Sequence, residues 1–239
     1  MTYSPTSWTG CCRVATTLGL SEVICLAKGQ EPAVLAQNVA SWTAEYLRWH
    51  FNRNGTAPRH YAHPDIRSAL RVETHAKCAY CEGRINDVAY DNIEHKLPKS
   101  TYPDLVCTWD NLTIACPRCN TNKGDYDSVN CPLLDPYTDE VEDDLAFGGP
   151  LALPRGGPRS RATVARLGLN RMELLYGRAQ VLEKLDLLLD LVERAEGQPA
   201  VAESLWLDID TLTAASSEFA SACRHFLASE ITKRGLARP

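Results

Sequence analysis

The sequence lacks any apolar run that would cross a bilayer, and it has no surplus of positive charge. Apolar stretches such as residues 187–189 fall far short of the roughly 20 residues that a membrane-spanning helix needs. With a net charge of −5 at pH 7, a nucleic-acid partner must bind a local patch or come through another protein. No basic segment followed by an apolar stretch occurs in the first thirty residues, so we expect no secretory signal and a cytoplasmic location.

Internal repeats and long low-complexity segments are also absent, which excludes collagen-like and wholly disordered chains. Hydrophobic residues make up 44% and charged residues 23% of the chain, both ordinary values for a globular protein. The 239 residues suffice for one large domain, or for a core module with a helical appendage.

The ten cysteines are the first feature with a chemical meaning. Without an export signal we expect no disulfide framework. Two Cys-x-x-Cys pairs, Cys78/Cys81 and Cys116/Cys119, can each present two thiolates to one ion and together form a tetrahedral zinc site. A redox pair and unrelated buried thiols are the alternatives. We interpret the other six cysteines as small buried hydrophobes.

The spacing of apolar residues predicts a mainly α-helical protein around a small, loop-rich central module. We divide the chain into an N-terminal helical segment (1–76), a central module (77–135), an acidic and then Gly/Pro-rich loop (136–159) and a C-terminal helical region (160–239). Residues 1 to 30 show no clean period and are expected to be irregular or loosely helical.

Helices are predicted at both ends of the chain. The N-terminal ones cover residues 32 to 51 and begin again near His63. A short helix from residue 160 should end at Gly168, and Asn170 should cap the next one, which runs to about Ala195. Helical patterning continues over residues 201–233, with a break predicted near residues 208–210.

Charges of opposite sign gather in neighbouring segments. Residues 151–180 hold six arginines against one glutamate, whereas residues 181–210 hold eight acids against two bases. Each run is either a solvated helix face or an interaction surface, with phosphate contacts on the basic side and a protein partner on the acidic side.

An adjacent acid and base stand inside the loop between the two cysteine pairs. The carboxylate of Glu94 can hold a hard divalent cation, and the imidazole of His95 can take a proton from water. Neighbours on a strand point to opposite faces, so both residues must sit at a strand end or a bend to serve one site. Considered without the neighbouring motifs, Glu94 and His95 are equally a pair of surface residues, and Asn120 is equally a helix cap.

The order of these motifs resembles that of the HNH endonuclease family, whose fold is the ββα-metal fold. The resemblance implies a mainly α protein with a small α+β core. The resemblance covers residues 77–127 and rests on Cys-x-x-Cys, Ile-Glu-His-x-x-Pro-Lys-Ser, Trp-Asp-Asn-Leu and Cys-x-x-Cys-Asn-x-x-Lys-Gly. Flanking motifs at residues 63–67, 132–136 and 167–171 resemble the PtuB-like nuclease subunit of Septu-type and retron-associated bacterial anti-phage systems.

The resemblance implies a role for each matching residue. His95 is the general base, Asn111 orients the base or fixes the loop, and Lys123 touches the scissile phosphate or neutralises Asp125. Glu94 and Asn120 are the catalytic metal ligands, where aspartate and histidine are more usual in the family. An all-oxygen ligand set favours Mg²⁺ or Mn²⁺, while the zinc ion joins the two cysteine knuckles without taking part in the chemistry.

Substrate and partner follow from the same resemblance. We expect the substrate to be nucleic acid, DNA rather than RNA, with tRNA as the alternative. We expect the partner to be a PtuA-like ATPase subunit that docks on the acidic stretch 183–210. Another possibility is a catalytically silent zinc module that acts as an adaptor. The candidate nucleic-acid contacts are Lys96, Lys99, Arg118, Arg155, Arg159 and Arg161.

Overall fold

The computed structural model describes residues 26–85, 91–127, 131–139 and 141–238. Helices dominate it, and its strands form two short antiparallel hairpins, as expected for a mainly helical protein with a small α+β core. The irregular start predicted for residues 1–30 falls mostly outside the described residues, as do Cys11, Cys12 and Cys25.

The N-terminal helices form where the apolar spacing places them. Helix α1 (Ala33–Asn52) follows Pro32, and helix α2 (Pro64–Glu73) has a proline in its first turn, where its missing N–H costs no hydrogen bond. A 3₁₀ turn, η1 (His60–Ala62), joins them. The backbone N–H of Asp65 donates to the His63 ring over 3.2 Å and so caps α2.

The central module is a hairpin followed by a short helix. Strand β1 (Asn92–His95) pairs antiparallel with β2 (Leu112–Ala115), and α3 (Pro117–Lys123) comes next in the chain and packs on β1. All of β2 is buried, and α2 packs on it. Two 3₁₀ turns, η2 (Pro103–Leu105) and η3 (Trp109–Asn111), lie in the connection between the strands. This order of elements is the predicted ββα arrangement.

The predicted loop over residues 136–159 is wrong in its second half. A single turn, α4 (Val141–Asp144), leads into a hairpin of β3 (Leu145–Gly148) and β4 (Leu151–Pro154). The glycines and prolines of residues 148–158 lie at the ends of the two strands, in the turn between them and in the residues after β4. Burial of Leu145 and Ala152, together with packing of β3 on α8, gives the hairpin its apolar support.

The C-terminal third consists of α5 (Pro158–Leu167), α6 (Met172–Arg194), α7 (Pro199–Thr213) and α8 (Ala220–Arg234). The predicted break at residues 208–210 is wrong, because the chain leaves the helix only after Thr213. Asp208 lies on the exposed side of α7, while Trp206 and Ile209 continue the buried stripe past it. An acid on the solvent side does not interrupt a helix.

Asn170 does not cap α6, contrary to the prediction. Arg171 occupies the N-cap position, and the Asn170 amide accepts from the N–H of Ala152 and donates to its carbonyl, both over 2.8 Å. The amide therefore fastens strand β4 to the start of α6.

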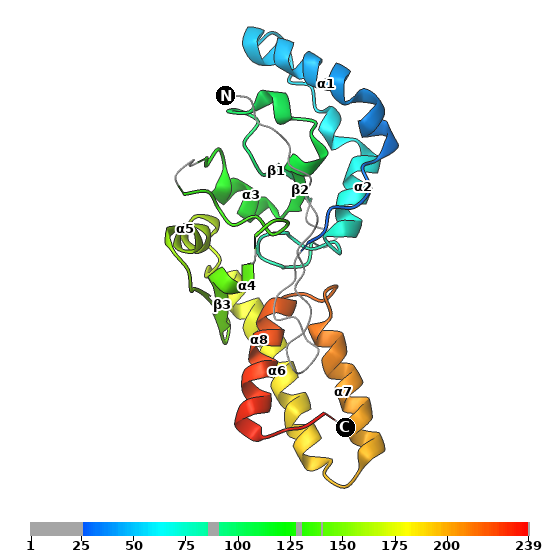
Figure 1. Cartoon of the computed structure of the whole chain (residues 1–239), viewed down its shortest axis with the longest axis vertical. Coiled ribbons are helices and arrows are strands. Elements are labelled where there is room, and N and C mark those ends of the chain that lie inside the picture. The colour runs from blue at the N-terminus through cyan, green and yellow to red at the C-terminus, as the bar shows by residue number, and fades with distance from the viewer. Residues whose placement is uncertain (1–25, 86–90, 128–130, 140, 239) are drawn as a thin grey trace.

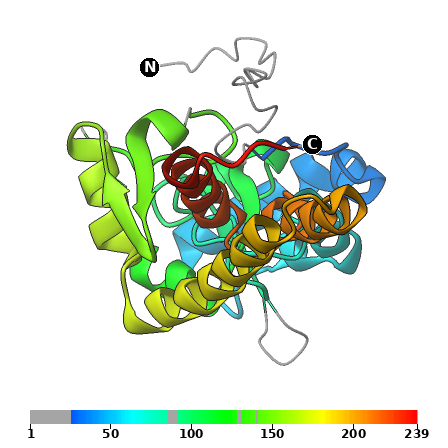
Figure 2. The same ribbon diagram turned by 90° about the horizontal axis from the view of Figure 1, so that it is seen from below.

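The elements assemble into an elongated molecule with two cores. Figure 1 shows α1 and α2 beside the module at one end, and α6, α7 and α8 together at the other. Seen from below, the β3–β4 hairpin and α5 lie on the side opposite α1 (Figure 2). The first core joins the module to Leu174 and Phe219, and the second lies among α6, α7 and α8. Over the described residues, no helix is both long and apolar enough to cross a membrane.

Candidate active site and metal centre

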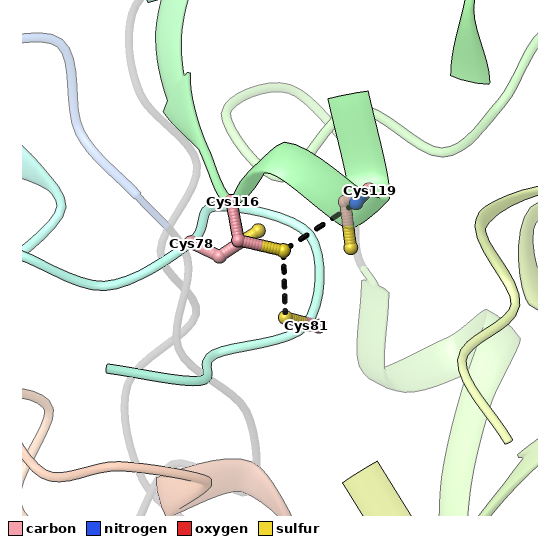
Figure 3. Close-up of side chains that lie close together, drawn as sticks. All are labelled: Cys78, Cys81, Cys116 and Cys119. Carbon is pink, nitrogen blue, oxygen red and sulfur yellow. Dashed lines mark hydrogen bonds between the residues drawn. The ribbon is translucent and has the colours of Figure 1, made fainter. Parts of the chain in front are cut away.

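Two backbone turns bring the four paired cysteines together, as the spacing predicts. Cys78 and Cys81 lie in the turn after α2, while Cys116 and Cys119 lie at the start of α3 (Figure 3). Their sulfur atoms all lie within 4.8 Å of one another. A zinc ion bound by four thiolates at about 2.3 Å has sulfurs about 3.8 Å apart. The cluster therefore fits one tetrahedral zinc ion, which it could bind as a structural site.

The cluster shows the surroundings of a closed structural site rather than a reactive one. Cys78, Cys81 and Cys119 are buried, and Cys116 is half-buried. The backbone N–H of Cys119 donates to the sulfur of Cys116 over 3.4 Å, which favours the thiolate form that a metal needs.

His95 ends strand β1 and is enclosed on every side. Its Nε2 donates to the carbonyl of Val106 over 3.0 Å, and the ring of Tyr61 meets the imidazole edge-on, with 4.7 Å between ring centres. A carbonyl has no proton to give, so Nε2 carries the hydrogen and Nδ1 keeps a lone pair. Burial, reinforced by the charge of Lys99, lowers the pKa of His95 to about 3, so the imidazole is neutral at pH 7.

Glu94 precedes His95 and is bound by a lysine from α3. The Nζ of Lys123 lies 2.6 Å from Oε1 of Glu94 and donates to the carbonyl of His95 over 2.8 Å. Burial raises the pKa of the Glu94 carboxyl, and the charge of Lys123 opposes this. Lys123 thus neutralises Glu94, and not Asp125 as one alternative had it.

The side chain of Asn111 joins two parts of the connection between β1 and β2. Its Oδ1 accepts from the N–H of Leu97 over 2.7 Å, and its Nδ2 donates to the carbonyls of Leu97 and Leu105 over 3.1 and 3.2 Å. Leu105 directly precedes Val106, whose carbonyl holds the His95 ring. Of the two roles expected for Asn111, the contacts match fixing the loop.

Asn120 lies in the middle of α3 and is half-buried. It stands three residues before Lys123, and residues at this spacing share one face of a helix. Lys123 reaches Glu94 from this face of α3.

The six residues expected to contact nucleic acid fall into three groups. Lys96 pairs with Asp135 over 2.7 Å, and Arg159 pairs with Asp139 over 2.6 Å, so each is held by an ion pair within the chain. Lys99 lies over the Tyr61 ring. The remaining three, Arg118, Arg155 and Arg161, are exposed.

Three features of these sites were not found from the sequence. Tyr61 has no motif around it, and the Val106 carbonyl belongs to the backbone, which no side-chain pattern marks. Arg171 lies against the cysteine sulfurs. It belongs to the flanking motif at residues 167–171, which was a signal without an assigned role.

Comparison with known proteins agrees with this geometry. The HNH endonuclease family model matches residues 78–126. The Septu protein PtuB of Bacillus thuringiensis is 33% identical over 177 residues, which cover 72% of this chain and 66% of that protein. The Septu protein PtuB of Bacillus mycoides strain KBAB4 is 28% identical, covering 53% of this chain and 54% of that protein.

The hairpin, the helix and the cysteine cluster together define an HNH nuclease domain closed by a metal-binding knuckle pair. The chain belongs to the HNH endonuclease family, and within it the chain is PtuB-like. It spans between about half and two thirds of the length of these two relatives.

Proposed function

We propose that this protein is a metal-dependent endonuclease that hydrolyses phosphodiester bonds in nucleic acid. The observation that carries the proposal is the hydrogen bond from Nε2 of His95 to the Val106 carbonyl. It fixes the tautomer that leaves Nδ1 free to take a proton from water, and burial keeps the ring uncharged before it does so.

The chain supplies the supports of such a base. As the ring gains a proton, the Val106 carbonyl stabilises the resulting imidazolium through the Nε2 hydrogen bond. Asn111 fixes the loop that carries this carbonyl. Tyr61 packs against the imidazole and restricts its rotation.

Glu94 and Asn120 would hold the catalytic cation. Both offer oxygen atoms, which suit Mg²⁺ or Mn²⁺. Such an ion, when bound, stabilises the charge that develops on the phosphoryl oxygens. Lys123 pairs with Glu94, so a cation bound there would share that carboxylate with the ammonium group.

We further propose that the enzyme is the nuclease component of a Septu-type anti-phage system, cleaves DNA rather than tRNA, and works in the bacterial cytoplasm with a PtuA-like ATPase. The support is the likeness to the two PtuB proteins. The acidic stretch 183–210 supports a docking face less strongly than its composition alone indicates, because part of its charge is already paired. Arg234 pairs with Asp190 over 2.7 Å and contacts Asp186.

The test is cleavage of plasmid DNA and of total tRNA with Mg²⁺ or Mn²⁺, with and without the ATPase. His95→Asn should lower the rate at least about 100-fold, because an amide is no base. His75→Asn is the matched control, since His75 is exposed and asparagine tolerates its positive φ of 53°. Equal rates in the two variants contradict the base assignment. Silence of the wild type with the partner present favours the adaptor function.

A further inference from the structure

Arg171, the last residue of the motif at 167–171, has no part in the proposed hydrolysis, yet it lies against the cysteine cluster. Its guanidinium group is 3.6 Å from the sulfur of Cys119, 3.7 Å from that of Cys116 and 3.8 Å from that of Cys81. One side chain from the start of α6 therefore donates to three of the four sulfurs.

Charge explains why an arginine is found there. A zinc ion with four thiolates carries net negative charge, and a buried charge needs a compensating partner. Within the described part of the chain, neither Arg171 nor Arg178 has a carboxylate at ion-pair distance. Arg178 is only 1% exposed and donates to backbone carbonyls, and it interacts electrostatically with Cys81 and Glu82. Of the two, Arg171 is the one whose guanidinium group contacts the cysteine sulfurs.

The first cysteine turn is also held by the connection between α7 and α8. Lys77 donates to the carbonyls of Ala215 and Ser217 over 2.6 and 2.9 Å. On the other side of the turn, the Glu82 carboxylate accepts from the N–H of Ser221 over 3.0 Å. The N–H of Arg84 donates to Glu218 over 2.8 Å. Residues 77–84 therefore carry two of the four cysteines of the cluster and are also bonded to residues 215–221 of the C-terminal bundle.

We propose that Arg171 stabilises the zinc-loaded cluster, and that zinc binding in turn fastens the start of α6 and the α7–α8 connection to the nuclease module. Arg171 is then a positioning residue, and metal binding and docking of the bundle are one event. The proposal concerns the cluster and the bundle alone, so it stands or falls independently of nuclease activity.

The first test measures how fast the full-length protein loses zinc to a chelating dye. Arg171→Met keeps the length of the side chain but removes its charge and donors, and it should release zinc about 10- to 100-fold faster. Arg194→Met is the matched control, because Arg194 is an exposed arginine at the far end of the same helix. Release at the control rate overturns the proposal.

The second test is hydrogen exchange of the zinc-loaded variants. In Arg171→Met the amides of residues 172–176 and 215–221 should exchange faster than in Arg194→Met, while the β1–β2 hairpin stays protected. Unchanged exchange at those segments overturns the coupling between metal and bundle. If Arg171→Met fails to fold, Arg171→Lys carries the test: faster zinc release than in Arg194→Lys supports the proposal, and equal release overturns it.

Discussion

Lys123 forms an ion pair of 2.6 Å with Glu94, and the two side chains are only 4% and 5% exposed. The same ammonium group donates to the carbonyl of His95. One lysine thus fastens helix α3 to strand β1 at the point where the candidate base and the candidate metal ligand meet.

Lys123→Met should destabilise the protein by about 3–5 kcal/mol, because it leaves a buried carboxylate without its partner. Urea unfolding measures the change. Lys233→Met is the matched control, since Lys233 is 65% exposed in its pair with Glu230 and should cost no more than about 1 kcal/mol. Equal unfolding midpoints for the two variants would contradict a structural role for the buried pair.

Asn111→Ala should lower both stability and cleavage. It removes three hydrogen bonds and takes away the Asn111 partner of both the N–H and the C=O of Leu97, at a cost of about 1–3 kcal/mol for each buried group that finds no water, whereas the Leu105 carbonyl still accepts from the N–H of Thr108. Asn111→Asp keeps the acceptor for the N–H of Leu97 and should lose less. The prediction is wrong if loop exchange and cleavage stay at wild-type values in the alanine variant.

Cys119→Ser should abolish binding of one zinc ion per chain and lower the melting temperature sharply, because the closed site contributes directly to folding. Cys223→Ser is the control, since Cys223 is buried but lies outside the cluster. Metal content and thermal melting give the answer. Full zinc occupancy in Cys119→Ser would contradict the four-thiolate site.

Acid should weaken the last turns of α8 through Glu230, whose partners Lys233 and Arg234 lie in the same helix. Lys233, and with it Arg234, holds the pKa of Glu230 below its ordinary value of 4.5. The stabilisation is therefore fully present above pH 4.5 and is lost as the pH falls through the lower, folded-state pKa. Glu230→Gln should melt below the wild type at pH 7, with a difference that shrinks toward pH 3. A difference independent of pH argues against this linkage.

What the sequence reveals of the site depends on whether the chemistry is local. Cys78 and Cys81 form a turn of their own, and the pairing of acid and base at residues 94 and 95 is visible in one short segment. The partner of Lys123 is not local, since it comes from a strand 29 residues earlier, and only the packing of α3 on β1 reveals it. For the same reason Arg159 looked free for nucleic acid, although Asp139 holds it.

The fold shows the same limit. Helices α1 and α6 are long enough for their apolar period to stand out, so their bounds agree with the prediction to within a few residues. The β3–β4 hairpin has only four residues in each strand and takes its support from α8, which lies far along the chain. Such a strand pair carries too little pattern of its own to be distinguished from a loop.

The side-chain amide of Asn170 makes the two backbone hydrogen bonds to β4 that a neighbouring strand would make. Both hydrogen bonds of this amide go to the backbone of Ala152. The N–H and C=O of this residue point away from β3. An open strand edge with unpaired N–H and C=O groups is a template on which another chain can add a strand. By filling the ladder position at the middle of β4, between the exposed Leu151 and Leu153, one side chain closes the edge that would otherwise be open to aggregation.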